Sequence, residues 1–416
     1  MDQAPGTGPQ LAQDLLASLR TTQASADPYP VYARLHQLGP VHRSSAGTVF
    51  VTGYDQCAAI VRDPAFGAQS PRWNDIATPG WRDRPGLVAT FETMLFRDPP
   101  EHTRLRRLVS GVFSPRHADR MRAQVRRLVS DALDTLADAG AAGSPVDLQE
   151  ILAGSLPIAV IAAIVGVPRA DWPALRAAIT ALLQVVELTA GPAALAEADA
   201  AAVALRDYFT ALVAARRAAP EDDLTSDLAA IAAAPAPGGG PACTEDELLQ
   251  TLTFVFMAGV DTMTNLLANG TAAFLAHPAQ AALLRAEPGR GPAAVEEVLR
   301  YDPPVQLVAR IAAAGASVGG VEVSAGELVV AVLGAAGRDP ARYQRPGAFD
   351  IARTQPGPVL AFGGGLHYCL GAPLARVEAD CFFSALLARF PRLRLAGTPA
   401  RSGMVFRGFS QLPVCW

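Results

Sequence analysis

A glycine-rich run that ends in a cysteine, directly before a predicted helix, constrains this chain more than any other feature. Residues 362–371 read FGGGLHYCLG, and the Ala-, Leu- and Arg-rich stretch 372–390 has helical periodicity. The glycines let the backbone adopt positive φ and pass close to a flat ligand. Cys369 is therefore expected at a helix N-terminus, where unpaired N–H groups and the helix dipole favour a thiolate. Such a thiolate is a nucleophile or a metal ligand, and a tight turn with a buried cysteine is the structural alternative.

The chain also predicts one unusually long apolar helix. Thr244 and Glu247 form a capping-box pattern, and apolar periodicity continues from there to about Leu275. At ~1.5 Å per residue such a helix spans on the order of 45 Å, which is the width of a molecule of this size. A buried helix of that length is expected to be the central axis of the fold.

Polar residues interrupt the middle of this helix. Gly259 costs about 1 kcal/mol there relative to alanine, and Asp261 and Thr262 follow it among large apolar side chains. The local interpretation is that the Thr262 hydroxyl binds the carbonyl four residues earlier and that Asp261 reaches solvent or a salt bridge. The functional interpretation, which needs a ligand beside Gly259, is a gap flanked by an alcohol and a carboxylate.

The pattern F-x-x-G-x-x-x-C-x-G resembles the haem-binding signature of the cytochrome P-450 family of haem-thiolate monooxygenases. Its fixed places are filled by Phe362, Gly365, Cys369 and Gly371. Three further segments resemble family motifs in the family's order, namely DPPEHTRLR at 98–106, AGVDT at 258–262 and the Glu-x-x-Arg pair at 297–300. The resemblance covers nearly the whole chain, from about residue 29 to residue 409.

The resemblance implies a mainly α fold with small β-sheets (α+β), a long central helix over haem b, and one domain across residues 1–416. Cys369 is the implied iron ligand. Asp261 and Thr262 are the implied catalytic residues, with Thr262 ordering the hydrogen bonds around dioxygen and Asp261 supplying protons through water. The other implied haem-binding residues are Phe362, Gly371 and four bases for the propionates, His102, Arg106, Arg310 and His367.

A few positions depart from the family pattern. Gly337 stands where asparagine is common before Arg338, and Met263 follows Thr262 where a second hydroxyl is frequent. Ala348 replaces the arginine expected before Phe349. The last difference predicts that the network of the 297–300 pair is one partner short.

Composition and charge exclude several other classes of protein. A net charge of −4 gives no basic surface for nucleic acid, and the five cysteines contain no CxxC pair. An odd number of cysteines fits a reducing cytoplasm. The N-terminus carries Asp2 where a signal peptide would be positive, so neither a signal nor a membrane anchor is expected. The uncharged stretch 151–167 is interrupted by Pro157 and two glycines, and it is interpreted as a buried core helix.

Periodicity predicts the other elements. Helices are expected around residues 103–139, 171–217, 245–276 and 372–390. Alternating, Val-rich strands are expected around residues 41–52 and 318–332. Residues 1–25 are expected to be a loosely ordered tail. Residues 232–242 have a linker composition, but the implied haem contacts of His102 and Cys369 lie on either side of them, so a surface loop is predicted.

Electrons are expected to come from outside the chain. Only 47 residues, 370–416, follow Cys369, which is too few for a fused flavin domain. The resemblance implies a separate ferredoxin and an NAD(P)H-dependent ferredoxin reductase. A basic docking face on the cysteine side is predicted from Arg104, Arg107, Arg122, Arg126 and Arg127.

The implied substrate contacts lie in four segments, residues 66–96 with Trp73 and Trp81, 254–258, 305–308 and 404–406. These are almost all apolar, with Gln306 as the polar exception, which predicts a sizeable hydrophobic substrate. Core packing is the alternative interpretation of each of these side chains. The expected reaction inserts one oxygen atom from O₂ into a polyketide or peptide secondary metabolite, free or bound to a carrier protein, by hydroxylation or epoxidation. Oxidative ring coupling, peroxide-driven haem chemistry and a non-catalytic haem-binding role are the alternatives.

Overall fold

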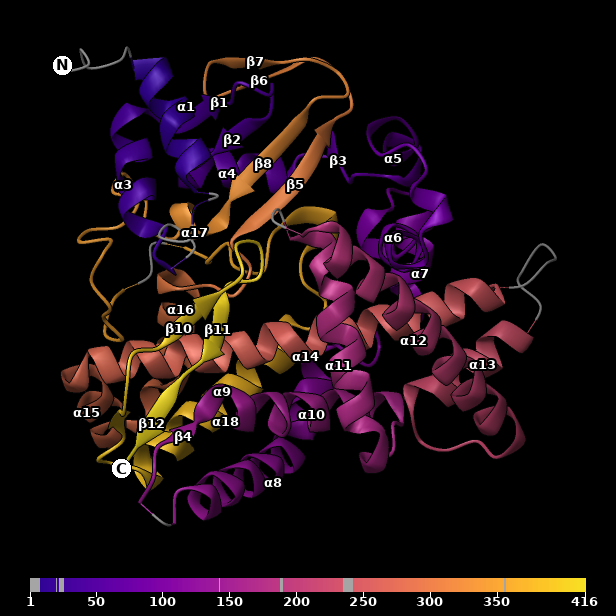
Figure 1. Ribbon diagram of the computed structural model, residues 1–416, viewed down its shortest axis with the longest axis vertical. Coiled ribbons are helices and arrows are strands. Elements are labelled where there is room, and N and C mark those ends of the chain that lie inside the picture. Colours follow the sequence, from indigo (N-terminus) through magenta and orange to yellow (C-terminus); the bar gives the residue numbers. More distant parts are fainter. Residues whose placement is uncertain are drawn as a thin grey trace.

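The computed structural model of this 416-residue chain describes residues 8–19, 21, 26–141, 143–187, 190–234, 242–354 and 357–416. Helices make up most of the molecule, and a small sheet lies at one end beside the N-terminal helices (Figure 1). The α-helices are α1 (Gly8–Ser18), α3 (Tyr29–Leu38), α4 (Tyr54–Arg62), α5 (Pro71–Ala77), α6 (Pro85–Phe91), α7 (Glu101–Val109), α8 (Pro115–Ala139), α9 (Leu148–Ala153), α10 (Leu156–Val165), α11 (Trp172–Leu183), α12 (Pro192–Ala218), α13 (Leu224–Ala233), α14 (Glu245–Ala276), α15 (Pro278–Ala286), α16 (Gly291–Tyr301), α17 (Leu333–Ala336) and α18 (Ala372–Arg389). Short 3-10 helices are η1 (Trp81–Asp83), η2 (Met94–Phe96), η3 (Arg169–Asp171), η4 (Gln184–Val186), η5 (Pro288–Arg290) and η6 (Gly365–His367). The predicted mainly helical fold with small sheets is confirmed.

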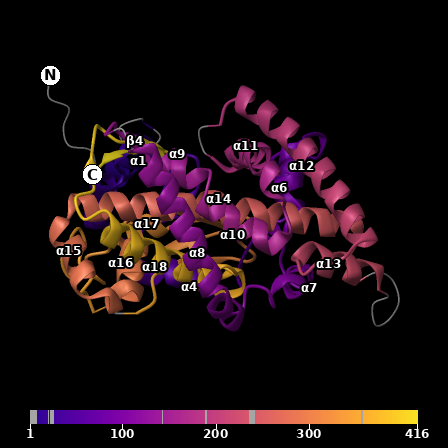
Figure 2. The same ribbon diagram turned by 90° about the horizontal axis from the view of Figure 1, so that it is seen from below.

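The helix α14 is the axis of the molecule. The Thr244 hydroxyl accepts the N–H of Glu247 and the Glu247 carboxylate accepts the N–H of Thr244, so the predicted capping box is present. Its 32 residues extend roughly 48 Å. Contacts with α9, α10, α11, α12, α16 and α18 cover it on several sides (Figure 2). Apolar side chains of these helices form one continuous core.

The strands form four small sheets. They are β1 (Val41–Arg43), β2 (Val49–Val51), β3 (Phe66–Gly67), β4 (Val146–Asp147), β5 (Leu307–Ala312), β6 (Ala316–Val318), β7 (Val321–Val323), β8 (Leu328–Val332), β9 (Arg394–Leu395), β10 (Ala400–Ser402), β11 (Gly408–Gln411) and β12 (Pro413–Cys415). The largest sheet has the order β1-β2-β8-β5-β3, with β2 and β8 parallel and the other pairs antiparallel. The remaining sheets are β4-β12-β9, β10-β11 and β6-β7.

Two of the predicted long helices are each broken into two. In 103–139 the chain leaves α7 and starts α8 at Ser114, whose hydroxyl caps the new helix directly before a proline. In 171–217 the chain leaves α11 and starts α12 at Gly191, again before a proline. Apolar periodicity continues across both breaks, so the periodicity alone did not reveal them.

The N-terminal expectation was wrong for residues 8–19. These residues form α1 and the turn after it, and Ala12, Leu16 and Leu19 are buried against α3 and the large sheet. Apolar residues at spacings of four and three residues lie on one face of the helix and the turn after it. The structure does not describe residues 1–7, 20 and 22–25. Of the predicted loop 232–242, α13 includes residues 232–233, and residues 235–241 lie outside the described part of the chain.

Two helical segments are apolar and long enough to cross a membrane, Leu148–Val165 and α14. In the apolar 18-residue window of each, 67% is buried inside the folded chain. The first is also interrupted between α9 and α10. The interpretation of residues 151–167 as core is confirmed by the burial of nearly every residue of α10.

A buried ion-pair network connects α16 to residues 348–353, which precede the cysteine loop (residues 362–371). Glu297 and Arg300 are both completely buried and share two hydrogen bonds of 2.8 Å. Arg300 also donates to the carbonyl of Ala348, and Arg353 Nε lies 3.3 Å from the Glu297 carboxylate. The expectation of a missing partner was therefore wrong, because Arg353 supplies the second cation from a position that no local pattern indicated.

Candidate active site

The cysteine loop before α18 is held by a hydrogen bond and by glycines. The N–H of Cys369 donates to the carbonyl of Phe362 at 2.9 Å. Gly363 and Gly365 have positive φ of 69° and 61°. A Cβ at Gly365 would lie 2.7 Å from the carbonyl oxygen of Val61, so the loop lies tightly against α4. The cysteine is thereby fixed at the start of α18, as the sequence predicts.

The Cys369 thiol is subject to opposing influences. Burial raises its pKa, and the N–H groups of Gly371 and Ala372 and the charge of Arg106 lower it. The N–H groups at the start of α18 thus favour the thiolate, as the sequence predicts, but without a bound cation burial outweighs them and the net shift of the Cys369 pKa is upward. A bound metal cation reverses this balance because a coordinating thiol loses its proton. A Cβ at Gly371 would lie 4.0 Å from the Cys369 sulfur, which is an ordinary van der Waals contact, so crowding at the sulfur does not by itself require a glycine there.

Basic side chains from α7, η6 and β5 meet beside this loop. The rings of His102 and His367 lie 4.4 Å apart. His102 Nδ1 and His367 Nε2 are buried and have no hydrogen-bond partner within the described part of the chain. Burial lowers the pKa of His102 to about 4 and that of Arg310 to about 10. The cluster therefore contains two buried ring nitrogens, His102 Nδ1 and His367 Nε2, that make no hydrogen bond within the described residues.

A haem fits these residues. Buried imidazoles and guanidinium groups need acceptors or anions, and Asp98, 3.9 Å from His367 Nε2, supplies one carboxylate. Two propionates would supply more, with Cys369 from the adjoining loop as the iron ligand. It was not predicted from the sequence that Asp98 belongs to this cluster. Asp98 begins the DPPEHTRLR segment, but the family resemblance assigns a role only to the histidine and the arginine of that segment.

Arg106 and Phe362 contact the cysteine loop directly. Arg106 Nη2 donates to the Tyr368 carbonyl at 2.8 Å. The Phe362 ring lies 6.4 Å from the Tyr368 ring and 4.6 Å from the Arg376 guanidinium. The partner of Arg106 in this structure is thus a loop carbonyl, and its contact with a propionate stays a prediction.

The acid and alcohol of α14 point to different partners. The Thr262 hydroxyl donates to the Ala258 carbonyl at 2.7 Å, which is the local interpretation of this residue. The Thr180 hydroxyl of α11 donates to Asp261 at 3.2 Å. Burial raises the pKa of Asp261 to about 6, and Thr180 and Arg176 oppose that shift. Asp261 is thus a carboxyl that exchanges its proton close to neutral pH.

Gly259 of α14 serves helix packing. A Cβ on Gly259 would collide with the Ile161 side chain of α10. The space that the sequence assigned to a ligand on that side of the helix is therefore occupied by α10. Sequence periodicity gives no sign of this contact, since it joins two helices about a hundred residues apart.

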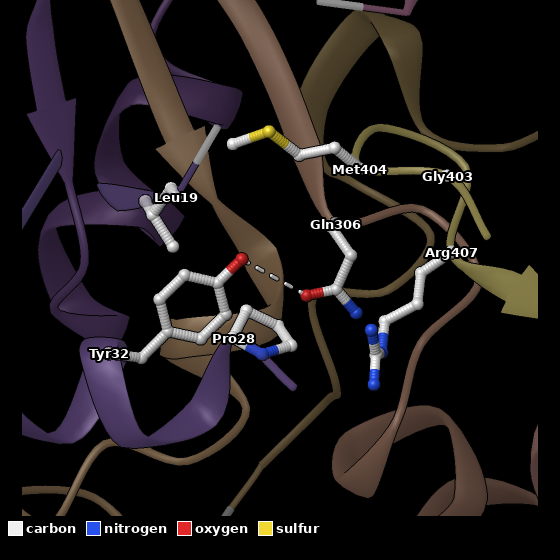
Figure 3. A pocket seen from close by; sticks show the side chains of 7 residues that line it. All are labelled: Leu19, Pro28, Tyr32, Gln306, Gly403, Met404 and Arg407. Carbon is white, nitrogen blue, oxygen red and sulfur yellow. Dashed lines mark hydrogen bonds between the residues drawn. The ribbon is translucent and has the colours of Figure 1, made fainter. Parts of the chain in front are cut away.

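Gln306 is not available as a polar substrate contact. Its side chain is 1% exposed, accepts from the Tyr32 hydroxyl at 3.3 Å and donates to the Pro303 carbonyl at 2.8 Å. Figure 3 shows this amide directed toward Tyr32, beside Met404 and Arg407. Of the two interpretations of Gln306, core packing agrees with its burial, and the Tyr32 hydroxyl that binds it comes from α3, far away in the sequence.

The predicted arginine face is only partly free. Arg104 forms an ion pair with Glu247, and Arg122 pairs with Asp380 at 2.9 Å. Arg107, Arg126 and Arg127 are exposed. The cysteine loop itself presents two large apolar side chains, Leu366 and Tyr368, which are 46% and 37% exposed. Arg62 borders this loop, because a Cβ on Gly364 would lie 3.0 Å from its Cγ.

Comparison with known proteins gives a consistent result. Residues 292–399 match the family model described as cytochrome P450. The chain is 37% identical to the cytochrome P450 monooxygenase PikC of Streptomyces venezuelae over 94% of this chain and 92% of that protein. It is 32% identical to 6-deoxyerythronolide B hydroxylase of Saccharopolyspora erythraea over 95% of this chain and 98% of that protein. The crystal structure of P450BioI with acyl carrier protein ligated to hexadec-9Z-enoic acid superposes with a TM-score of 0.87 at 34% identity, covering 95% of this chain and 100% of that one.

A helical scaffold with a cysteine loop, a long core helix and a cluster of unsatisfied bases is the architecture of a haem-thiolate oxidoreductase. Relatives of more than 30% identity that align with more than nine tenths of this chain show which family it belongs to. The chain belongs to the cytochrome P450 family, and it is a monooxygenase that uses haem.

Proposed function

We propose that this monooxygenase inserts one oxygen atom into a mostly apolar secondary metabolite of polyketide or peptide origin, by hydroxylation or epoxidation. The observation that carries the proposal is the convergence of Cys369 with two buried imidazoles, His102, whose Nδ1 has no hydrogen-bond partner within the described residues, and His367, whose Nε2 has only Asp98 at 3.9 Å. The relatives PikC and 6-deoxyerythronolide B hydroxylase support this substrate class. The enzyme is placed in the cytoplasm, which fits its five free cysteines.

The haem, when bound, supplies oxygen activation with electrons that originate from NAD(P)H. The chain's own residues do the rest. Cys369 of the cysteine loop would hold the iron, and Arg310, together with the imidazoles of His102 and His367, would donate charge-assisted hydrogen bonds to the propionates. Phe362 and Gly371 shape the loop around the sulfur. Arg106 fastens that loop to α7 through the Tyr368 carbonyl.

Protons are delivered from α14. Asp261, with a pKa of about 6, exchanges protons with water near neutral pH and is held in place by Thr180. The Thr262 hydroxyl is held by the Ala258 carbonyl and offers its lone pairs, and on rotation its proton, to the substrate side of the helix. Thr262 is proposed to order the hydrogen bonds there, and Asp261 is proposed to replace the protons that the reaction consumes.

Thr262→Ala is the direct test of this assignment. The reduced, CO-bound protein should keep the long-wavelength Soret band of thiolate ligation, because Cys369 is untouched. Product formed per NAD(P)H consumed should fall about tenfold or more, with hydrogen peroxide released in place of product, since the proton path is lost. Unchanged coupling would remove Thr262 from the mechanism. Absence of the thiolate band in the unaltered protein would overturn the haem-thiolate assignment as a whole.

The substrate form is tested by titrating the ferric protein. Free macrolides, aromatic metabolites and terpenes are compared with the same acyl or aminoacyl groups tethered to a carrier protein. A saturable low-to-high-spin shift with one free class identifies the scaffold. A shift with tethered compounds alone assigns the enzyme to a carrier-bound intermediate, a possibility that the P450BioI complex with acyl carrier protein supports.

The proposed electron donor is a ferredoxin, reduced by a ferredoxin reductase. Exposed Leu366 and Tyr368 form an apolar centre on the cysteine loop, and Arg62 and Arg106 border this loop. Arg107, the next residue of α7, is exposed. An acidic ferredoxin fits such a surface through charge complementarity. The shortest path to the iron runs through Cys369, which the same loop carries.

A further inference from the structure

Glu187, the residue that follows η4 at the end of α11, holds the loop between β10 and β11. Its Oε2 accepts the N–H groups of Met404 at 3.0 Å and Val405 at 3.1 Å, and its Oε1 accepts that of Phe406 at 2.8 Å. Three successive backbone donors thus converge on one carboxylate that lies more than two hundred residues earlier in the chain. Glu187 is only partly buried.

The loop is shaped to receive an anion. Gly403 has φ of 74°, and a Cβ there would collide with the Phe406 carbonyl and lie 3.3 Å from Glu187 Oε1. Consecutive N–H groups that point to one side form a concave anion site, and hydrogen bonds to a charged acceptor are stronger than neutral ones. The carboxylate of Glu187 fills this site.

The other side of the loop is fixed to the segment before β5. The N–H of Gln306 donates to the Val405 carbonyl at 2.9 Å, and the N–H of Arg407 donates to the Pro304 carbonyl at 2.7 Å. Figure 3 shows the same loop from that side, with Met404 directed toward Leu19 and Tyr32. The loop is therefore a fixed anchor, and Glu187 is the part that can detach.

The end of α11 lies between two regions expected to contact substrate. The turn η4 contacts both α6, which belongs to the segment 66–96, and α12. Glu187 then fastens this turn to the loop 403–407, as the proximity of the α11 end to the loop between β10 and β11 in Figure 1 illustrates. One side chain thus joins the end of α11 to the loop 403–407, whose residues 404–406 are an expected substrate segment.

We propose that Glu187 is a latch that fastens the end of α11 to the loop 403–407, and that its release sets the rate at which substrate enters and leaves. The proposal rests on the proposed oxidation of a large apolar substrate, which needs a path into the protein. Release is feasible because the carboxylate and the three N–H groups all find water when they separate, so the net cost is far below the sum of the bonds. Glu187 is a positioning residue and touches no reacting atom.

The test compares Glu187→Gln with Glu197→Gln, a matched control on the exposed surface of α12. Glutamine keeps the size of the side chain, removes the charge and turns an NH₂ group toward N–H donors. Hydrogen–deuterium exchange of the Met404, Val405 and Phe406 amides should accelerate about tenfold or more in the first variant and stay unchanged in the control. This readout needs neither haem nor turnover.

The second readout is stopped-flow binding of 4-phenylimidazole to the ferric holoenzyme, followed by absorbance. Loss of the latch should raise the association and dissociation rate constants together, about fivefold or more, with little change in their ratio. Unchanged amide exchange overturns the latch. Faster exchange with unchanged binding rates overturns its control of entry. Because the exchange readout is independent of the reaction, a failure of the proposed function leaves it interpretable.

Discussion

A single buried carboxyl on α18, Glu378, has no role in the proposed mechanism. It lies nine residues after Cys369, is 2% exposed, and its Oε1 has no hydrogen-bond partner within the described part of the chain. Burial raises its pKa from 4.5 to about 8. The carboxyl is therefore protonated in the folded protein at neutral pH, because a charge there would have neither water nor a partner.

Replacing this carboxyl should change how stability depends on pH. The folded pKa lies above the unfolded one, so the contribution of Glu378 is complete below about pH 4.5 and is lost as the pH rises toward 8. Glu378→Gln should gain stability relative to the unaltered protein by roughly 3 to 5 kcal/mol between about pH 5 and about pH 8.5, at about 1.4 kcal/mol per pH unit. Urea unfolding of both proteins at the two pH values measures it. A difference that does not vary with pH would show that the carboxyl is ionised in the fold.

At the scale of elements, the fold depends on close contact between α10 and α14. Gly259 is where the two helices approach, with Ile161 filling the space of the missing Cβ. Alanine at position 259 would favour the isolated helix by about 1 kcal/mol. The packing conflict opposes this gain, since a full core adapts poorly to an added methyl group.

The expected result is that Gly259→Ala lowers the free energy of unfolding by about 1 to 3 kcal/mol. Combining it with Ile161→Ala should recover part of that loss, because the new methyl group then has space. Urea unfolding of the two single variants and the double variant forms the cycle. Strict additivity would mean that Gly259 is needed for a reason other than this contact.

Across the whole molecule, charge is distributed unevenly. The chain carries a net charge of −4, yet arginines lie around the exposed apolar side chains of the cysteine loop. Arg62 and Arg107 are exposed, whereas Arg104 and Arg122 of the predicted face are neutralised by carboxylates. The surface that attracts an acidic partner should therefore be smaller than the five arginines predicted from the sequence, and it should be centred on the cysteine loop.

Reduction by ferredoxin should weaken as salt rises. The rate constant is expected to fall about tenfold between about 50 mM and about 500 mM salt, as the Debye length shortens. Arg62→Glu and Arg107→Glu should each slow reduction at low salt. Arg392→Glu should not, because Arg392 is exposed beyond the far end of α18, about 27 Å along that helix from the cysteine. Stopped-flow reduction under CO measures the rate constant for all three variants. A rate constant that does not change with salt concentration would exclude this surface as the docking site.

Local sequence signals, namely capping patterns and apolar periodicity, predicted much of the architecture. The capping box at Thr244 and sustained periodicity placed both ends of α14 within a residue or two, because capping and amphipathicity act over a single helix. The breaks before α8 and α12 were missed, since apolar spacing continues across them. Arg353 was missed for a different reason, because its partner Glu297 belongs to another element.

The sequence by itself determined the family and the mainly helical class, and it is the source of the proposed roles of Cys369, Asp261 and Thr262, because the motifs concerned consist of residues close together in the chain. Only the tertiary structure decided that Asp261 faces α11, that Gly259 makes room for α10, that Gln306 is occupied by Tyr32 and that Glu187 binds the loop 403–407. Each of these joins residues tens to hundreds of positions apart. Such contacts arise from the packing of whole elements, and no spacing within one element encodes them.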